Sequence, residues 1–501
     1  MKIFTAEQIR KADAYTIAYE PVTSLKLMER AAEACTRWLL NHFPNKTTYQ
    51  IFCGTGNNGG DGLAIARLLA QQGLKVNVFT EEHAKNLTED CAVNLQRLKE
   101  MVGIAINSWE EFSAFSFSSN SVVIDALFGT GLNRPVEGSR KEVILRLNQL
   151  PYPTVSIDVP SGLNPDVLFE DKPAIVKADF TLSFQFWKRT FLHPESGIFV
   201  GKVEILDIGL DSKFIESEPS DFFVTDDVLA KKLYRPRNKF SHKGTYGKSK
   251  IIAGSFGKIG AAVLAAKAAL RSGSGLTTVQ APDVGYDILQ TSCPEAMFVS
   301  GGEKIITSFR VAEDEVAGIG PGLGTELETS TAFLKFLEEA KHPLILDADA
   351  LNILSQNSEN LKLLPVRSVI TPHPKEFARL FGESKNSFER LNLAMRKAKD
   401  YQIFIVLKDH HTQVVTPEGK VYYNITGNSG LAKGGSGDVL LGIITSLVTQ
   451  GYPSQDACVF GVWLHGKAAD FAADTLAKES MLATDVINCL SDVFRWLNKN
   501  P

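Results

Sequence analysis

An aspartate that follows a run of glycines is the clearest candidate for chemistry in this sequence. The segment Gly434–Gly437 precedes Asp438, and the apolar run Val439–Thr449 that follows predicts a helix. Backbone N–H groups at a helix N-terminus form an anion hole that can hold a transferring phosphoryl group. The Asp438 carboxylate could then accept a hydroxyl proton, or it could only favour the helix dipole.

A second glycine-rich segment, Gly54–Gly62, has five glycines in nine positions between an expected strand and an expected helix. Glycine permits close backbone approach and positive φ, and a helix N-terminus adds exposed N–H groups and a favourable dipole. We therefore expect a phosphate or pyrophosphate group at this turn, although an ordinary tight turn has a similar composition.

Two further strand ends carry an aspartate followed by small residues, at Asp125 and at Asp158. In a doubly wound sheet, ligands bind beyond the carboxyl ends of the strands, so both loops should converge near Gly54–Gly62. Together with Asn58 and Ser161, the two aspartates offer hard oxygen ligands for a cation. Each aspartate could instead cap a turn.

Composition limits the class of protein. A chain of 501 residues, 44% hydrophobic and 22% charged, predicts a soluble globular protein of two large domains or about three smaller ones. The net charge of −4 argues against nucleic-acid binding, and no apolar run is long enough to span a membrane. The first residues lack a secretory pattern and the six cysteines form no C-x-x-C pair, so we expect a cytoplasmic protein with reduced thiols.

Runs of β-branched and aromatic residues alternate with helical stretches in both halves of the chain, which predicts two α/β domains with parallel sheets. A polar, acidic interruption separates them, and we place the domains at residues 1–215 and 225–497. The first domain should contain a helix over Gly62–Gln72 and strands over Tyr49–Cys53, Lys75–Phe79, Val122–Asp125, Thr154–Asp158, Phe180–Phe184 and Lys202–Leu206. The second should contain strands over Lys250–Ala253, Leu276–Gln280, Val316–Ile319, Leu344–Asp347, Val369–Thr371 and Phe404–Leu407, and helices over Gly260–Ser272, Gly437–Thr449, Gln455–Leu476 and Ala483–Asn498.

Three motifs of the first domain, at residues 57–62 (NNGGDG), 125–132 (DALFGTGL) and 157–162 (IDVPSG), resemble a known family. In this order and spacing they are similar to the NAD(P)H-hydrate epimerase domain, also called the YjeF N-terminal domain. The resemblance implies a Rossmann-like fold, a potassium ion bound by Asn58, Asp125 and Ser161, and Asp158 as the acid–base group at the nicotinamide C6. Lys188 matches a lysine of that family and would assist Asp158, or it would be a solvated surface lysine. The residues that would bind the hydrated nucleotide are Asn57, Asn58, Gly59, Gly60, Asp61, Gly129, Thr130, Gly131, Leu132, Asn133, Arg134, Pro135 and Asp158.

The chemistry fits this resemblance. Inversion at C6 of a hydrated dihydropyridine needs reversible loss of a bond at that carbon together with proton transfers. A positioned carboxylate suffices for those transfers, and no redox cofactor is required.

The second domain resembles the ribokinase-like fold, and five motifs point to one branch of it. They lie at residues 242–247 (HKGTYG), 320–324 (GPGLG), 346–351 (LDADAL), 371–376 (TPHPKE) and 434–438 (GGSGD). Together they are similar to ADP-dependent NAD(P)H-hydrate dehydratase, the YjeF C-terminal domain. By this resemblance the hydrated nucleotide would contact Ala261, Gly322, His373 and Asp438, and the adenine nucleotide would contact Lys408, Asp409, His410, His411, Thr412, Gly434, Gly435, Ser436 and Gly437.

Two residues depart from the family pattern. Lys375 stands where the family usually has glycine after His-Pro, and Asp409 stands where it usually has glycine after lysine. Both belong to nucleotide loops, so we expect them to alter individual nucleotide contacts more than the reaction, because Asp438 and its glycines are intact.

The two resemblances together imply a bifunctional enzyme. It would equilibrate the R and S hydrates of NADH and NADPH (NADHX and NADPHX) and dehydrate the S form at the expense of ADP, giving AMP and phosphate. The expected cofactors are K⁺ and Mg²⁺, with ADP or ATP as co-substrate, and we expect a homo-oligomer with no nucleic-acid or membrane partner. Two alternatives stay open: a ribokinase-like small-molecule kinase fused to a nucleotide-binding domain, and a non-catalytic nucleotide sensor.

Overall fold

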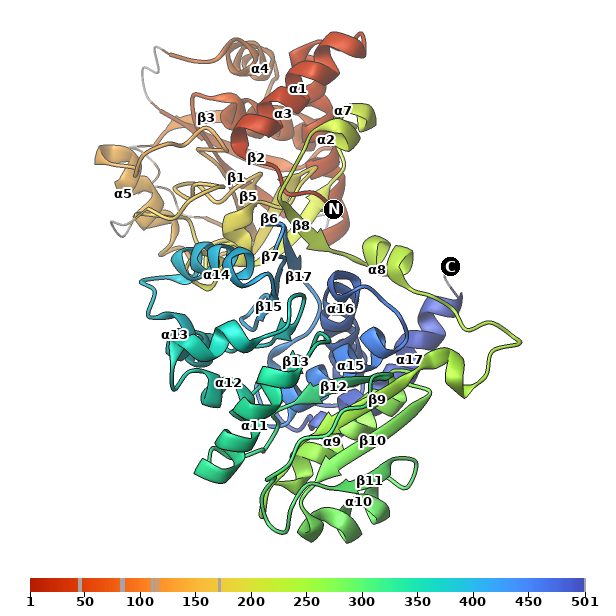
Figure 1. Cartoon of the computed structure of the whole chain (residues 1–501). Coiled ribbons are helices and arrows are strands. Elements are labelled where there is room, and N and C mark those ends of the chain that lie inside the picture. Colours follow the sequence, from red (N-terminus) through yellow and green to blue (C-terminus); the bar gives the residue numbers. More distant parts are fainter. Residues whose placement is uncertain are drawn as a thin grey trace. The chain divides into compact units, whose positions relative to one another are not determined.

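The computed structural model describes residues 1–43, 47–81, 86–109, 112, 115, 117–169 and 173–499 (Figure 1). Contacts divide the chain into two compact units, one of Lys2–Ser220 and one that joins Met1 to Asp221–Pro501. Each unit has its own sheet and its own hydrophobic clusters. Within the described residues, no helix combines the length and the apolar character that a membrane span needs.

The first unit is built on a seven-stranded sheet of order β3-β2-β1-β4-β5-β6-β7, in which all neighbouring strands are parallel. Because the strand order reverses between β1 and β4, the loops that follow these two strands flank a crevice at the carboxyl edge of the sheet. The strands are β1 Thr48–Cys53, β2 Lys75–Thr80, β3 Ala105–Ser108, β4 Ser121–Ala126, β5 Thr154–Ile157, β6 Phe180–Phe184 and β7 Lys202–Leu206.

Helices cover both faces of this sheet because the side chains of β1 alternate between two hydrophobic clusters. Tyr49, Ile51 and Cys53 belong to the cluster that includes α2 and α3, whereas Phe52 stacks on Phe79 in the opposite cluster. The helices are α1 Ala6–Tyr19, α2 Ser24–His42, α3 Asn57–Gln71, α4 Glu89–Lys99, α5 Gly138–Leu147, α6 Pro194–Gly197 and α7 Ser212–Ser217.

The second unit holds a ten-stranded sheet of order β11-β10-β9-β12-β13-β14-β15-β16-β17-β8. Only β16 runs antiparallel to its two neighbours, and the yellow-green β8 lies beside the blue β17 in Figure 1. The strands are β8 Phe222–Thr225, β9 Lys248–Ile252, β10 Leu276–Ala281, β11 Met297–Ser300, β12 Glu315–Ile319, β13 Ile345–Leu346, β14 Val369–Ile370, β15 Phe404–Leu407, β16 Gln413–Val415 and β17 Val421–Asn424.

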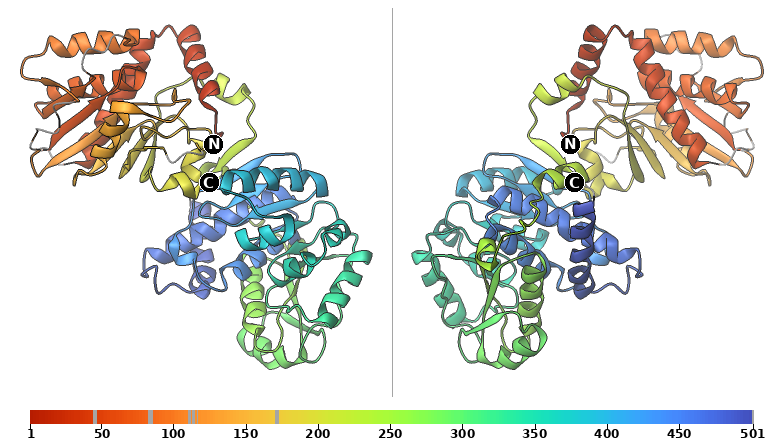
Figure 2. Two further views of the ribbon diagram at one scale, coloured as in Figure 1. Left: turned by 90° about the vertical axis from the view of Figure 1, so that its left-hand side faces the viewer. Right: turned by 90° about the vertical axis from the view of Figure 1, so that its right-hand side faces the viewer.

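The helices of the second unit bring distant parts of the chain together. Helix α9 packs against α15 and α17, so that green and blue segments share one unit (Figure 2). The strand order reverses between β9 and β12, which places a second crevice at the carboxyl edge of this sheet. The helices are α8 Asp227–Leu233, α9 Ile259–Arg271, α10 Tyr286–Ser292, α11 Leu327–Glu339, α12 Asp349–Leu354, α13 Pro374–Phe381, α14 Ser387–Tyr401, α15 Ser436–Thr449, α16 Ser454–Ala473 and α17 Ala483–Lys499.

Every strand predicted from the sequence is present, and no strand end differs by more than two residues. Two helix boundaries are wrong, because α3 begins at Asn57 and not at Gly62, and α16 ends at Ala473 and not at Leu476. None of the glycines in Gly54–Gly62 has positive φ. They permit close approach instead, since a Cβ on Gly59 would lie 1.9 Å from the carbonyl oxygen of Gly54. The helix can therefore start inside the glycine-rich segment and pack directly on the loop after β1.

This packing predicts that Gly59→Ala destabilises the first unit by about 1–3 kcal/mol, because the new methyl group meets backbone that cannot rotate away. Gly56→Ala is the matched control, since no atom lies within 4 Å of a Cβ at that position. Urea denaturation of both full-length variants measures the difference. Equal stability of the two variants would show that the segment relaxes around the methyl group.

Candidate active sites

A buried ion pair organises the site of the first unit. Lys188 is completely buried, and its Nζ donates to Asp158 Oδ1 at 2.6 Å, to Ser183 Oγ at 2.8 Å and to the carbonyl oxygen of Phe184 at 3.1 Å. Lys188 is therefore not a solvated surface lysine, and that alternative is wrong. Its ammonium group has no proton left for a ligand, so it holds Asp158 in place.

The backbone of Asp158 is itself constrained. Its φ of 62° lies in the left-handed region, which few non-glycine residues occupy. Its N–H donates to the carbonyl oxygen of Leu182 at 2.8 Å, and its Oδ1 accepts from the N–H of Phe184 at 3.2 Å. These bonds to β6 hold the strained turn at the end of β5, as is common at functional positions.

A cavity of about 540 Å³ opens beside Asp158 at the switch point between β1 and β4. Of the residues predicted to bind the hydrated nucleotide, those that line it are Asn57, Asn58, Asp61, Gly129, Thr130, Gly131, Leu132, Asn133, Arg134 and Asp158. Gly59, Gly60 and Pro135 are not among the lining residues, and the two glycines are buried in α3. The structure therefore brings the three sequence motifs to one cavity.

The cavity also contains residues that the sequence analysis missed, above all Asp13 from α1. Burial and the charge of Asp158 raise the pKa of Asp13 to about 7, against an opposing effect of Lys188. Burial, together with the charges of Asp158 and Asp13, raises the pKa of Asp61 well above its ordinary value. The signal for α1 was present in the sequence, since Thr5 and Gln8 form a capping box.

Two of the three residues predicted to bind potassium, Asp125 and Ser161, are joined by hydrogen bonds. Asp125 is fully buried and accepts hydrogen bonds from Ser156 Oγ, Ser161 Oγ, Ser161 N and Leu127 N. Burial raises the pKa of Asp125, and no ion pair neutralises it among the described residues. Asn58 lines the cavity of this unit, where its side chain lies beside Gly129. The oxygen atoms of Asp125 and Ser161 are hard ligands of the kind that suit a cation.

In the second unit, Asp438 lies in the first turn of α15, three residues after the N-cap Gly435, whose φ is 93°. Burial raises the pKa of Asp438 to about 7, and the charges of Asp347 and Asp349 add to this while Lys408 opposes it. A carboxylate whose pKa lies near neutrality is suited to general base catalysis.

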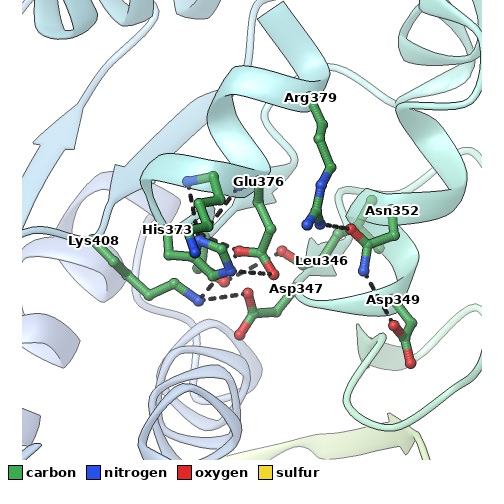
Figure 3. Close-up of polar contacts among 10 residues, drawn as sticks. Leu346, Asp347, Asp349, Asn352, His373, Glu376, Arg379 and Lys408 are labelled. Atoms are coloured by element: carbon green, nitrogen blue, oxygen red, sulfur yellow. Dashed lines mark hydrogen bonds and ion pairs between the residues drawn. The ribbon is translucent and has the colours of Figure 1, made fainter. Parts of the chain in front are cut away.

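Lys408 links the loops after three strands (Figure 3). Its Nζ lies 2.8 Å from Asp347 Oδ1 and 3.8 Å from Glu376 Oε2. His373 caps α13. Its Nδ1 accepts from the backbone N–H of Lys375 at 3.1 Å, and its backbone N–H donates to Glu376 Oε2 at 2.8 Å. The imidazole is thereby fixed beside the lysine network, and burial together with the charge of Lys408 lowers its pKa.

A cavity of about 460 Å³ adjoins this network. The predicted nucleotide-binding residues that line it are Lys408, Asp409, His410, His411, Thr412, Ser436 and Gly437. Gly434 and Gly435 are not among the lining residues, and Ala261 and Gly322 pack against each other beside Lys258, outside this cavity. His242–Gly247 precedes β9 and lies against Gly275, at the amino edge of the sheet and not among the carboxyl-edge loops.

The sequence analysis also missed His465 of α16, which lines the same cavity. Its Nε2 is buried without a partner in the described residues, and burial lowers its pKa to about 4, so the imidazole is neutral. No sequence pattern separates this histidine from the apolar core residues around it in α16.

The two departures from the family pattern have local explanations. Lys375 lies in the first turn of α13, where lysine adopts helical backbone without strain, and its side chain is exposed. Asp409 forms a largely buried ion pair with Arg390 of α14. Its charge is therefore balanced at the edge of the cavity.

Two family models match this chain, one within each of the two units. A family model described as YjeF-related protein N-terminus matches residues 24–190, and one described as NAD(P)H-hydrate dehydratase matches residues 249–491. The bifunctional NAD(P)H-hydrate repair enzyme of Moorella thermoacetica is 33% identical over 518 residues, which cover 100% of this chain and 98% of that protein. The enzyme of the same name from Escherichia coli is 34% identical over 496 residues, covering 98% and 93%.

A solved ribokinase-like superfamily protein from Enterococcus faecalis is 27% identical, with a TM-score of 0.50, and its match covers 56% of this chain and 98% of that one. The fold and the sites thus define a two-unit α/β enzyme with a Rossmann-like unit followed by a ribokinase-like unit. The chain belongs to the family of bifunctional NAD(P)H-hydrate repair enzymes. The resemblance drawn from the sequence motifs is confirmed.

The buried ion pair predicts that Lys188→Met destabilises the first unit by about 3–5 kcal/mol, because Asp158 loses its counter-charge. The double variant Lys188→Met/Asp158→Asn should recover part of that loss, since no unpaired carboxylate remains. Urea denaturation of the full chain measures both effects. A Lys188→Met variant as stable as the wild type would show that the pair contributes nothing to the fold.

Proposed function

We propose that the first unit equilibrates the R and S hydrates of NADH and NADPH, and that the second dehydrates the S hydrate using ADP. The observation that carries the proposal is a matched pair of sites. In the first unit Asp158 lines a cavity together with residues of the family motifs, and in the second Asp438 directly follows Ser436 and Gly437, which line the other cavity. The resemblance over the whole chain supports one protein with both activities.

In the first unit the chemistry needs proton transfer at the oxygen on C6. Asp158 is held by Lys188 and exposes part of its carboxylate to the cavity, so it can take the proton that an oxygen loses on bonding to C6. The N–H groups at the start of α3 and the loop Gly129–Arg134 would hold the phosphates and ribose of the nucleotide.

In the second unit Asp438 would remove the proton of the C6 hydroxyl while that oxygen attacks the β-phosphoryl group of ADP. The P–O bond to AMP breaks, and the backbone amides of Gly434–Gly437 at the N-terminus of α15 stabilise the transferring group. The C6–O bond then breaks with loss of a C5 proton, which releases phosphate and restores the dihydronicotinamide ring. His373, Gly322 and Ala261 would orient the hydrated ring.

We also propose K⁺ and Mg²⁺ as bound ions. Asn58, Asp125 and Ser161 would hold K⁺, which would neutralise the buried charge of Asp125 and order the loops of the first unit. In the second unit Asp347, Asp349 and Asp438 carry more negative charge than Lys408 balances, which suits a divalent ion that arrives with nucleotide phosphates. Mg²⁺ would there neutralise charge on the phosphates during transfer.

The remaining proposals concern cellular context. All six cysteines are unpaired thiols, which supports a reducing compartment such as the cytoplasm. The net charge of −4 supports small molecules, NADHX, NADPHX and ADP or ATP, as partners in place of nucleic acid. A homo-oligomer stays a prediction, which size-exclusion chromatography with light scattering can check.

If each unit carries one of the two activities, two variants should each lose a different activity. With a mixture of R and S NADH hydrate, Mg²⁺ and ADP, wild-type protein should restore the dihydronicotinamide absorbance completely. Asp438→Ala should abolish this recovery but leave epimerisation intact. Asp158→Ala should give a fast phase for the S hydrate and then a slow phase at the spontaneous epimerisation rate.

Reactions with ADP, with ATP and without nucleotide define the co-substrate. Loss of both activities in either folded variant would contradict the division of labour. Nucleotide consumption on another alcohol without recovered absorbance would favour the small-molecule kinase, and no turnover at all would favour the nucleotide sensor.

The pKa of Asp438 predicts the pH dependence of dehydration. Its base form is present above about pH 7, so the rate should rise with pH and level off above that value. Asp347→Asn removes a negative charge that raises the pKa of Asp438, so the rising limb should move to lower pH. Asp287→Asn, on exposed α10, is the control and should leave the limb in place. If the dehydration rate of Asp347→Asn still rises near pH 7, the titration of Asp438 does not cause the pH dependence.

A further inference from the structure

Helix α1 is fixed in the first unit by contacts that its sequence could not reveal. Phe4 packs on Phe186, with ring centroids 4.8 Å apart, and the N–H of Ala6 donates to Asp166 Oδ2 at 3.0 Å. Thr16 Oγ1 accepts from the N–H of Asp211 at 3.0 Å. Because both ends of the helix are held, the positions of the residues between them relative to the cavity are fixed.

Asp13 is the acidic residue that α1 contributes to this cavity. It lies one turn after Ile9, which also lines the cavity, and directly after the buried Ala12. Its carboxyl group has no hydrogen bond or ion pair with any residue in the described part of the chain. It is therefore available to a ligand in the cavity that Asp158 also lines.

Inversion moves the oxygen from one face of C6 to the other, so a second proton-transfer group would serve the oxygen that leaves while Asp158 serves the oxygen that arrives. Lys188 cannot be the second group, because it is completely buried and is not among the residues that line the cavity. The arginines of the cavity, Arg10, Arg134 and Arg140, do not give up protons at neutral pH. Among the described lining residues, Asp13 and Asp61 are left.

Exposure distinguishes these two aspartates. Asp61 is 8% exposed in α3, within the motif expected to hold the nucleotide, whereas Asp13 is half-buried. We propose that Asp13 is the second acid–base group of the epimerase site and acts on the C6 oxygen together with Asp158. This inference rests on the proposed function of the first unit.

The proposed step balances without any redox partner. The Asp13 carboxyl gives its proton to the C6 hydroxyl, the C6–O bond breaks with its electron pair on oxygen, and water leaves. The N1 lone pair forms a C6–N1 double bond. Water then adds to C6 from the other face, its oxygen forms the new C6–O bond, and its proton passes to the Asp158 carboxylate. Exchange with solvent restores both aspartates.

The charges around Asp13 suit an acid at neutral pH. Burial and the charge of Asp158 raise the pKa of Asp13 to about 7, and the charge of Lys188 acts in the opposite direction. Arg10 of the same helix also lines the cavity. Since the acid form is the one required, epimerisation should fall as pH rises above about 7.

The test measures conversion of purified R hydrate to S hydrate by the full chain, with the spontaneous rate subtracted. Asp13→Asn should lower kcat by about 10²–10⁴-fold with little change in KM, and the limb above pH 7 should disappear. Asp13→Glu should restore part of the rate and the limb. Glu7→Gln is the matched control, because Glu7 is an exposed acid on the same helix whose carboxylate pairs with Lys11.

Thermal unfolding of each variant and ADP-dependent dehydration of purified S hydrate check that the chain is folded. A folded Asp13→Asn protein that epimerises like wild type, with the limb intact, would overturn the role of Asp13 alone. A wild-type protein that does not epimerise would overturn the proposed function of the first unit, and this inference with it.

Discussion

Both sites depend on one electrostatic constraint, which is the burial of several carboxylates around a single lysine. In the first unit Lys188 pairs with Asp158, and the charge of Asp158 acts on both Asp13 and Asp61. In the second, Lys408 is shared by Asp347 and Glu376, and Asp438 stands beside them. Because one ammonium group cannot neutralise three carboxylates, some of them hold their protons near neutral pH. This charge imbalance turns ordinary acidic side chains into groups that can exchange protons.

The sheet topology makes this arrangement possible. In the first unit the strand order reverses beside the cavity, so loops from opposite directions along the sheet converge there. In the second unit the cavity lies where the loops after β15 and β17 meet the start of α15. Parallel strands end at the same edge, and the side chains after β13 and β15 of the second unit are therefore brought together although they are distant in sequence. Hydrophobic clusters that pack helices against each sheet hold the edge in place.

Much of this could be predicted from the sequence, because the strands are apolar runs and because glycine-rich loops and strand-end aspartates follow local rules. Asp158, Asp438 and the glycine-rich loops were found in this way. The links between loops could not be predicted, since the bond of Lys408 to Asp347 spans 61 positions and depends on tertiary packing. Asp13 was missed because α1 is anchored by distant residues such as Asp166 and Asp211. His465 was missed because it stands among core residues of a buried helix.

The close contacts of glycine backbone have a consequence for ligand binding. A Cβ on Gly54 would lie 1.9 Å from the carbonyl oxygen of Leu127, and a Cβ on Gly320 would lie 1.8 Å from that of Asp347. In both units, then, neighbouring loops touch backbone to backbone without side chains between them. Loops joined in this way have little freedom to lose when a nucleotide arrives, so less of the interaction energy is consumed by ordering the protein. Scarce, damaged nucleotides could be captured at low concentration for this reason.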